Sequence, residues 1–322
     1  MITGRLPARW AARLSSPEVT MIRLALAALC GVLVLAATPV AQVVARSEAD
    51  LVVLHVSVFD GRSDAVPDLP RSAFVVRDND EIQDITFFSS TDVPVAVGLV
   101  IDNSGSMIAR RPMVLAGASA FAASSRPEDD LFSVIFNEHV RFGLPGGVRF
   151  TRSREQLTSS LSRYPTSGRT ALHDAVIAGL DHLKNASHQK RALVVLSDGD
   201  DNASRQTRAQ MLAAATASDA LIYTVARRDS TTGTHGNPSV MKKLAEATGG
   251  VAYFPRTDKD VVDSFGEIAG NIHRGYSIGY VPASSGDGRY HRVTVTAHMP
   301  GRTRLSTHTP DGYVAPRPDG AP

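Results

Sequence analysis

Three separated stretches of this chain carry side chains that could together bind a metal ion. The stretch LVIDNSGSM places Asp102, Ser104 and Ser106 at alternate positions of one segment. The stretch SGRTALHDAV contributes Thr170, and VVLSDGDDN contributes Asp198. These five side chains offer only oxygen donors, which suit Mg²⁺, Mn²⁺ or Ca²⁺ and not zinc or copper.

The segments around these residues predict the elements that would position them. Apolar runs at residues 95–101, 131–136, 192–196 and 221–226 alternate with segments whose apolar residues recur at helical spacing. This alternation predicts an α/β fold with a doubly wound, mostly parallel sheet covered on both faces. Because ligands bind at the carboxyl ends of strands in such sheets, the three loops can converge on one ion.

Shorter strand patterns flank this region on both sides. They occupy residues 51–59, 73–76 and 82–88 before it, and 276–281, 291–297 and 304–308 after it. Alternating apolar residues and Gly or Asp turns favour antiparallel strands here. We therefore expect the two flanks to pair into a small β module. The expected boundaries are 47–92 for the N-terminal β segment, 93–275 for the α/β domain, 276–314 for the C-terminal β segment and 315–322 for a disordered tail.

The five oxygen-bearing residues resemble a known metal site. Their pattern, D-x-S-x-S followed by a distant Thr and then an Asp after a later strand, is similar to the metal-ion-dependent adhesion site (MIDAS) of von Willebrand factor type A (VWFA) domains. The flanks, including GYSIGYVP and the final DGYV, resemble those of VWFA-related secreted proteins of Acidobacteria. The turn at residues 78–80 departs from that pattern, in which an acidic residue, Asp and Gly are usual.

The resemblance implies a binding function. It implies that Ser104, Ser106 and Thr170 contact the ion directly, while Asp102 and Asp198 act partly through water. Two carboxylates are too few to neutralise and enclose the ion, so one coordination position would stay open for an Asp or Glu side chain of a protein ligand. We therefore expect cation-dependent protein binding and no enzymatic activity.

Two other functions use similar arrangements and remain alternatives. A metal-dependent phosphohydrolase would need a second Asp where Ser104 stands, since that residue serves as its general acid. An accessory subunit of a metal-chelatase complex also uses such domains, but it would be cytoplasmic.

Polar residues near the five candidates have simpler interpretations. We expect residues 200–202 to form a turn and a helix cap rather than to supply further ligands. A calcium loop of the EF-hand type starting at Asp198 would need Gly and Glu where Ala203 and Ala209 stand. His173, on the first turn of the following helix, is expected to pack or lie at the surface rather than act as a base.

The first 45 residues have the layout of a secretory signal. An apolar run from residue 24 to 37 follows Arg23 and is broken by Thr38 and Pro39. We expect residues 21–45 to be a signal peptide cleaved after Ala45, with an uncleaved membrane anchor as the alternative. In both cases the remainder would be exported, as a secreted, periplasmic or membrane-anchored protein. We interpret residues 1–20 as an over-extended start.

Charge and cysteine content exclude several other functions. The chain has 34 Lys and Arg against 32 Asp and Glu, and the first 45 residues hold four Arg and one Glu of these, which leaves 30 basic and 31 acidic side chains. No basic cluster stands out, so we expect no nucleic-acid partner. The single cysteine, Cys30, and the single tryptophan, Trp10, would be removed with the signal. The mature chain could then form neither a disulfide nor a thiolate metal site.

Overall fold

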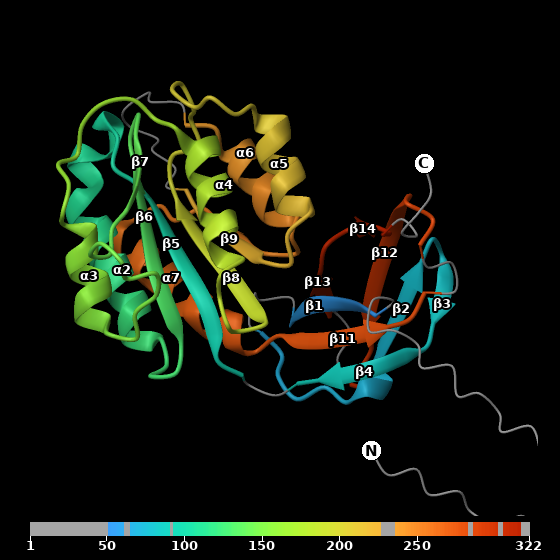
Figure 1. Ribbon diagram of the computed structural model, residues 1–322. Coiled ribbons are helices and arrows are strands. Elements are labelled where there is room, and N and C mark those ends of the chain that lie inside the picture. The colour runs from blue at the N-terminus through green and yellow to red at the C-terminus, as the bar shows by residue number, and fades with distance from the viewer. Residues whose placement is uncertain are drawn as a thin grey trace, which may run out of the picture. The chain divides into compact units, whose positions relative to one another are not determined.

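A computed structural model describes residues 51–60, 65–90, 93–226, 236–282, 286–301 and 305–316 (Figure 1). All of them belong to one compact unit of the chain, Glu48–Pro322. The predicted signal peptide and residues 1–20 lie outside the described residues, as do residues 317–322 of the predicted tail.

The larger sheet has six strands in the order β10-β9-β8-β5-β6-β7. Their bounds are Val95–Asp102 for β5, Asp130–Phe136 for β6, Val140–Phe142 for β7, Lys190–Leu196 for β8, Leu221–Val225 for β9 and Ala252–Tyr253 for β10. Strands β10, β9, β8, β5 and β6 run parallel, and β7 pairs antiparallel with β6. All eight residues of the central strand β5 are buried, as its continuous apolar run predicts.

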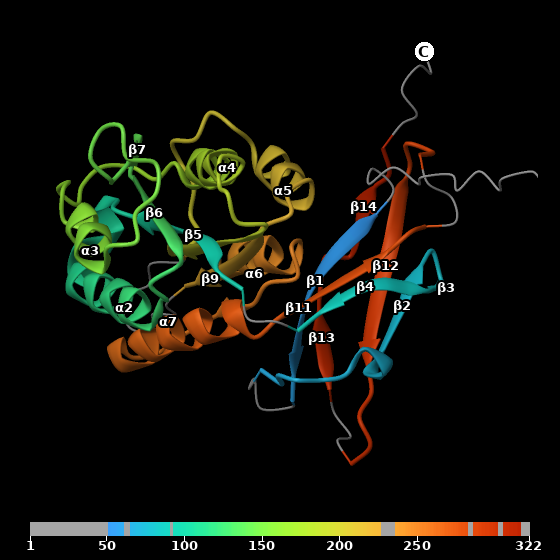
Figure 2. The same cartoon turned by 60° about the horizontal axis from the view of Figure 1, so that its bottom comes forward.

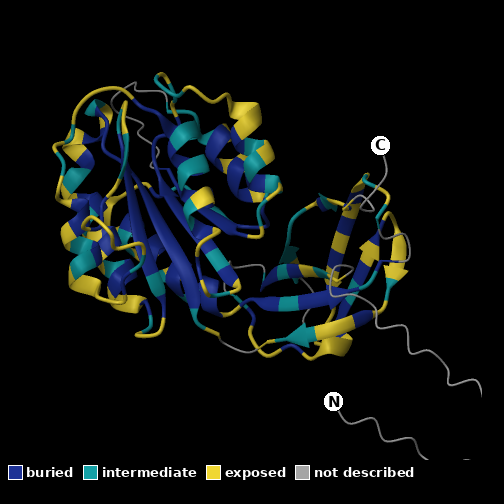
Figure 3. Ribbon diagram, in the orientation of Figure 1, coloured by how far each residue is buried: buried dark blue, intermediate teal, exposed yellow. Residues whose placement is uncertain are grey.

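Helices cover both faces of this sheet (Figure 2). The 3₁₀ helix η3 spans Gly105–Arg110, and the α-helices are α2 (Arg111–Ser124), α3 (Arg154–Leu161), α4 (Leu172–Leu183), α5 (Arg208–Thr216), α6 (Pro238–Glu246) and α7 (Asp258–His273). Helices α2, α3 and α7 pack on the face that Val97 and Leu99 of β5 present. Helices α4, α5 and α6 pack on the opposite face with Ala96 and Val100. Strands are buried between helices whose outer faces are exposed (Figure 3). The predicted doubly wound α/β fold is confirmed.

The flanking segments form two four-stranded antiparallel sheets. One has the order β13-β1-β11-β4 and the other β14-β12-β2-β3. Their strands are β1 (Val52–Phe59), β2 (Phe74–Asp78), β3 (Glu81–Gln83), β4 (Ile85–Ser89), β11 (Tyr276–Tyr280), β12 (Tyr290–Ala297), β13 (Ser306–His308) and β14 (Gly312–Val314), with the 3₁₀ turn η2 at Arg71–Ala73. Strands β1 and β4 pair with β11, and β2 pairs with β12. The predicted pairing of the two flanks is therefore confirmed.

A buried polar network joins the two sheets of the β module. The Asp78 carboxylate accepts hydrogen bonds from the hydroxyls of Tyr280 (2.9 Å) and Tyr313 (3.0 Å), and its other oxygen lies 2.8 Å from Nδ1 of His291. Asp78 and His291 are both buried. Since a buried carboxylate needs partners for its oxygens, this network links β2, β11, β12 and β14 in one arrangement.

Two details of the β module differ from the sequence prediction. The strand expected over residues 82–88 is two strands, β3 and β4, because the chain passes from one sheet to the other at Asp84: β3 pairs with β2, and β4 pairs with β11. Ala315, which we placed in the tail, is buried, and its backbone N–H donates to the carbonyl of Arg289 at 2.8 Å.

Candidate metal centre

The carboxylate of Asp102 is fixed at the carboxyl end of β5. It is fully buried, with 0% of its surface exposed. Its Oδ1 accepts a hydrogen bond from the backbone N–H of Ser104 (2.9 Å), and its Oδ2 accepts one from the hydroxyl of Ser197 at the end of β8 (2.7 Å). Both oxygens are therefore held by groups from the ends of two adjacent strands.

Four of the five predicted residues lie in one hydrogen-bonded cluster. From Asp102 the cluster continues through Ser104, whose hydroxyl oxygen lies 3.2 Å from that of Ser106. The Ser106 hydroxyl then donates to Oδ2 of Asp198 at 2.9 Å. Asp102, Ser104 and Asp198 are buried, whereas Ser106 is exposed. The cluster is thus open to solvent on its Ser106 side. We refer to these four side chains as the oxygen cluster.

Thr170, the fifth predicted residue, is buried and is tied to the loop after β8 by its backbone. Its N–H donates to Oδ1 of Asn202 (2.9 Å), and its carbonyl accepts from the N–H groups of Asn202 (3.0 Å) and Ala203 (2.9 Å). In the described part of the chain, the Thr170 hydroxyl takes no part in the hydrogen bonds of the oxygen cluster. Backbone hydrogen bonds thus hold Thr170 against the loop that carries Asp198, although the side chains of Thr170 and Asp198 are not hydrogen-bonded to each other.

The loop before Thr170 is fastened to the loop after β5. The Asn103 side-chain amide donates to the carbonyls of Tyr164 (3.2 Å) and Pro165 (2.7 Å), and its oxygen accepts from the hydroxyl of Thr166 (2.8 Å). The backbones join as well, because the N–H of Gly105 donates to the carbonyl of residue 168 at 3.0 Å. These bonds explain why residues 61 to 63 positions apart meet at one edge of the sheet.

The residues that we expected to form a cap do bind backbone groups at the start of α4. The Asp201 carboxylate accepts from the N–H of His173 (3.0 Å), and Asn202 accepts from the N–H of Thr170. The Nδ1 atom of His173 lies 3.1 Å from the carbonyl oxygen of Gln206 and 3.5 Å from Asp201. His173 is therefore packed against this loop, as predicted. Asp201 stabilises the positive end of α4.

The electrostatics of the cluster favour a bound cation. Burial raises the pKa of Asp102 to about 6, although hydrogen bonds from Ser104 and Ser197 act in the opposite direction, and the nearby charge of Asp198 raises it further. Two buried carboxylates in one cluster repel each other, and a cation would relieve that repulsion. The donors are carboxylate and hydroxyl oxygens, which fit a hard divalent cation. Within the described residues, no group of three or more His, Cys, Asp or Glu side chains could hold a metal.

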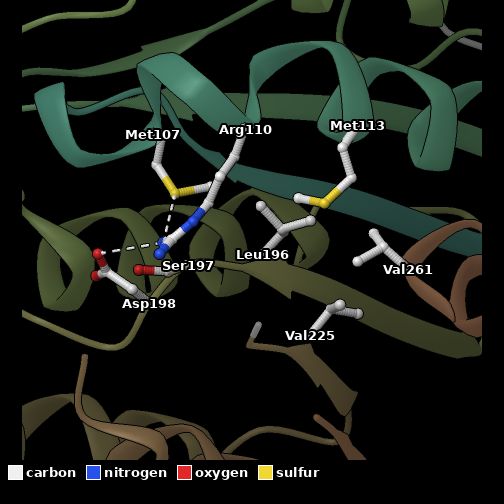
Figure 4. Close-up of a pocket in the computed structure, with 8 residues that line it drawn as sticks. All are labelled: Met107, Arg110, Met113, Leu196, Ser197, Asp198, Val225 and Val261. Atoms are coloured by element: carbon white, nitrogen blue, oxygen red, sulfur yellow. Dashed lines mark hydrogen bonds and ion pairs between the residues drawn. The ribbon is translucent and has the colours of Figure 1, made fainter. Parts of the chain in front are cut away.

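Sequence reasoning missed two residues that touch Asp198. Arg110, the last residue of η3, places its Nη1 3.8 Å from Oδ2 of Asp198 (Figure 4). Gly236 lies so close to Asp198 that a Cβ atom there would meet the backbone of Asp198. Arg110 could have been suspected, because it follows Ser106 by four residues and would share its face on a helical turn. The sequence gives no comparable signal for Gly236.

Arg110 also borders a small cavity behind the cluster. Met107, Met113, Leu196, Val225 and Val261 form its apolar walls. Figure 4 shows Arg110 extending from η3 past these walls toward Asp198.

The domain is an open α/β sheet that carries carboxylates and hydroxyls at the carboxyl ends of its strands. Residues 97–200, which include all five candidates, match the family model of the von Willebrand factor type A domain. The chain therefore contains a von Willebrand factor type A domain.

Two solved structures from bacteria illustrate what the chain is similar to. A von Willebrand factor type A protein from Catenulispora acidiphila aligns with a TM-score of 0.51 and 15% identity, covering 84% of this chain and 75% of that chain. The vWF domain of the type V pili tip protein Mfa5 from Porphyromonas gingivalis gives a TM-score of 0.47 and 12% identity, covering 56% of this chain and 96% of that chain. The first of these likenesses shows the fold. A comparison with curated protein sequences gives no match.

Proposed function

We propose that this protein is an exported module that binds a protein ligand through a divalent cation, Mg²⁺ or alternatively Mn²⁺ or Ca²⁺. The observation that carries this proposal is the hydrogen bond from Ser106 to Asp198, which joins the loops after β5 and β8 in one oxygen cluster. The cluster lies in a von Willebrand factor type A domain, at the sheet edge where such folds bind ligands. The resemblance to a metal-ion-dependent adhesion site points in the same direction.

In this proposal, Asp102, Ser104, Ser106, Thr170 and Asp198 hold the ion. The bound ion supplies a positive charge to which a carboxylate of the partner can bind. Ser104 N–H and Ser197 keep Asp102 oriented, and the exposed Ser106 marks the side from which the partner approaches.

The charge balance of the cluster supports an acidic partner. The two carboxylates carry two negative charges, whereas the guanidinium of Arg110 and a divalent ion carry three positive charges. The loaded cluster would therefore have an excess of one positive charge. An Asp or Glu side chain of the partner would neutralise this excess in a partly buried site. We therefore propose binding rather than turnover, and expect no Mg²⁺-dependent hydrolysis of p-nitrophenyl phosphate.

Export is a further part of the proposal. It rests on the signal-like pattern of residues 21–45, which lie outside the described residues. Among the described residues, no helix combines the length and the apolar character needed to cross a membrane. In this proposal, the alternative of a membrane anchor is assigned to the N-terminal segment, on its apolar sequence pattern.

The experiment compares the wild type with Asp102→Asn, which removes the buried charge and keeps the side-chain size. We expect the wild type to bind Mg²⁺ by calorimetry and to retain a partner protein in Mg²⁺ but not in chelator. Asp102→Asn should lose both properties. Asp181→Asn, at an exposed residue of α4 that pairs with Lys184, makes the same charge change away from the cluster and should behave as wild type. Equal metal binding by Asp102→Asn would refute the proposal.

A further inference from the structure

Arg110 lies on the inner side of the oxygen cluster. Its Nη1 is 3.8 Å from Oδ2 of Asp198, the same oxygen that accepts the hydrogen bond of Ser106. It also lies 3.8 Å from the sulfur of Met107. Arg110 and Asp198 are each only 8% exposed. An arginine this deeply buried requires a negative partner, and Asp198 supplies one.

We infer that Arg110 is an internal counter-cation that competes with the divalent ion for Asp198 and so lowers the metal affinity of the site. The inference rests on the metal site of the proposed function, but not on the identity of the partner. It assigns Arg110 a role in setting affinity, distinct from the roles of the oxygen donors.

The competition follows from the charges and from the shared oxygen. Without a divalent ion, the guanidinium compensates the charge of Asp198 and stabilises the buried pair of carboxylates. When the ion binds at the cluster, the guanidinium and the ion repel each other across one carboxylate. Because this edge of the sheet is partly shielded from water, the repulsion is weakly screened. Removing the charge of Arg110 should therefore strengthen ion binding by about tenfold or more.

A positioning role for Arg110 predicts the opposite result. If Arg110 only held Asp198 in place, its loss would loosen a ligand and weaken ion binding. The direction of the change in affinity therefore separates the two roles.

The test measures Mg²⁺ and Mn²⁺ binding calorimetrically for the wild type, Arg110→Gln and Arg111→Gln. Arg111 is the matched control, because it is adjacent in sequence and its guanidinium donates to the carbonyl of Leu161 on α3 instead of reaching Asp198. We expect Arg110→Gln to bind both ions at least about tenfold more tightly and Arg111→Gln to stay within about twofold of the wild type. Without metal, Arg110→Gln should melt at a lower temperature than the wild type.

Unchanged or weaker binding by Arg110→Gln, while the wild type binds normally, would overturn this inference and leave the proposed function standing. Absence of binding in all three proteins would overturn both. If Arg110→Gln does not fold without metal, the side-chain Nε–H resonance of Arg110 in the wild type, assigned with Arg110→Lys, gives a second measurement. Faster exchange of this proton with water on saturation with Mg²⁺ would show that the ion loosens the contact between Arg110 and Asp198 and supports the competition, whereas unchanged or slower exchange contradicts it.

Discussion

Asp102 is a residue at which the stability of the metal-free chain and the proposed metal binding oppose each other. Burial raises its pKa to about 6, so at pH 7 the metal-free native chain keeps an ionised carboxylate in surroundings that disfavour it. We expect Asp102→Asn to be more stable than the wild type without metal, by up to about 3 kcal/mol. Urea denaturation at pH 7 in chelator measures this difference. A less stable variant would mean that the bonds from Ser104 and Ser197 outweigh the cost of burying the charge.

Lys190 is a second buried charge, at the opposite end of β8 from the oxygen cluster. It is 5% exposed, and its ammonium donates to the carbonyl of His273 at 3.4 Å. Burial lowers its pKa to about 8, with a further contribution from the positive charge of Arg126, while Asp129 acts in the opposite direction. Below pH 8, the folded chain therefore carries a charge in poorly solvated surroundings.

Lys190→Met should stabilise the protein at pH 7 by about 2 kcal/mol, because it keeps the length of the side chain and removes the charge. The native pKa is lower than the usual 10.5, so the wild type gains stability as the pH rises from about 8 to about 10.5. The advantage of the variant should therefore shrink over that range, as measured by urea denaturation at pH 7 and pH 10. Lys184→Met, at an exposed lysine, is the control and should change little. Destabilisation by Lys190→Met at pH 7 would contradict this account.

The four side chains of the oxygen cluster could be picked out of the sequence as candidates, but the residues that contact them could not. The spacing of Asp102, Ser104 and Ser106 after a buried strand is a local property that the sequence displays directly. The contact between Arg110 and Asp198 joins residues 88 positions apart, and it depends on how η3 packs over the end of β8. The close approach of Gly236 to Asp198 depends likewise on tertiary packing.

At the scale of elements, the hairpin between β2 and β3 carries backbone strain. Asp78 pairs with Glu81, so Asn79 and Asp80 form a two-residue turn, with φ of 47° and 71°. Both central residues of such a turn need positive φ, and glycine adopts this conformation without steric cost. This is the turn at which the sequence departs from the usual acidic residue, Asp and Gly.

Asp80→Gly should therefore stabilise the protein by about 0.5–1 kcal/mol. The ion pair that Asp80 makes with Arg292 is exposed, and its loss should matter little. Chemical denaturation measures the change, with Asp80→Asn as a control that should stay near the wild type, because asparagine also tolerates this conformation. A clear loss of stability in Asp80→Gly would show that the side chain of Asp80 contributes more than the strain it causes.

Elements with strong apolar periodicity were predictable, and short polar elements were not. The continuous apolar run at residues 95–101 predicts a buried strand, and the apolar residues at helical spacing in α7 predict a helix with one buried face. Strand β7 and helix α3 could not be predicted in this way, since β7 has only three residues and α3 is mostly polar. The predicted strand over residues 82–88 was wrong in its continuity, because the sequence pattern does not reveal the break at Asp84.

At the scale of the whole molecule, the α/β domain is inserted between the two halves of the β module. Strand β11, which follows α7 directly, lies between β1 and β4, which both precede the domain. Neither flank can complete its sheets alone. The pairing was predictable from the strand character of both flanks, but its order was not, because strand order depends on long-range contacts.

Processing of the N-terminus is a prediction at this scale. We expect the exported protein to begin after Ala45 and therefore to lack Trp10, the only tryptophan of the chain. Intact mass and tryptophan fluorescence of the protein recovered from the producing cells measure this. An intact mass that includes residues 21–45 would contradict cleavage and favour a retained N-terminal anchor, since a chain that starts at Met21 lacks Trp10 in either case.

The central claim is that the oxygen cluster, together with Thr170, holds a hard divalent cation that keeps a position free for a partner. Anomalous diffraction from a crystal soaked in Mn²⁺ tests it most directly. We predict one manganese peak within bonding distance of the Ser104 and Ser106 hydroxyls, near Asp102 and Asp198, with at least one coordination site filled by water. The account would be contradicted by the absence of a peak at the cluster, or by an ion whose coordination sites are all filled by atoms of this chain.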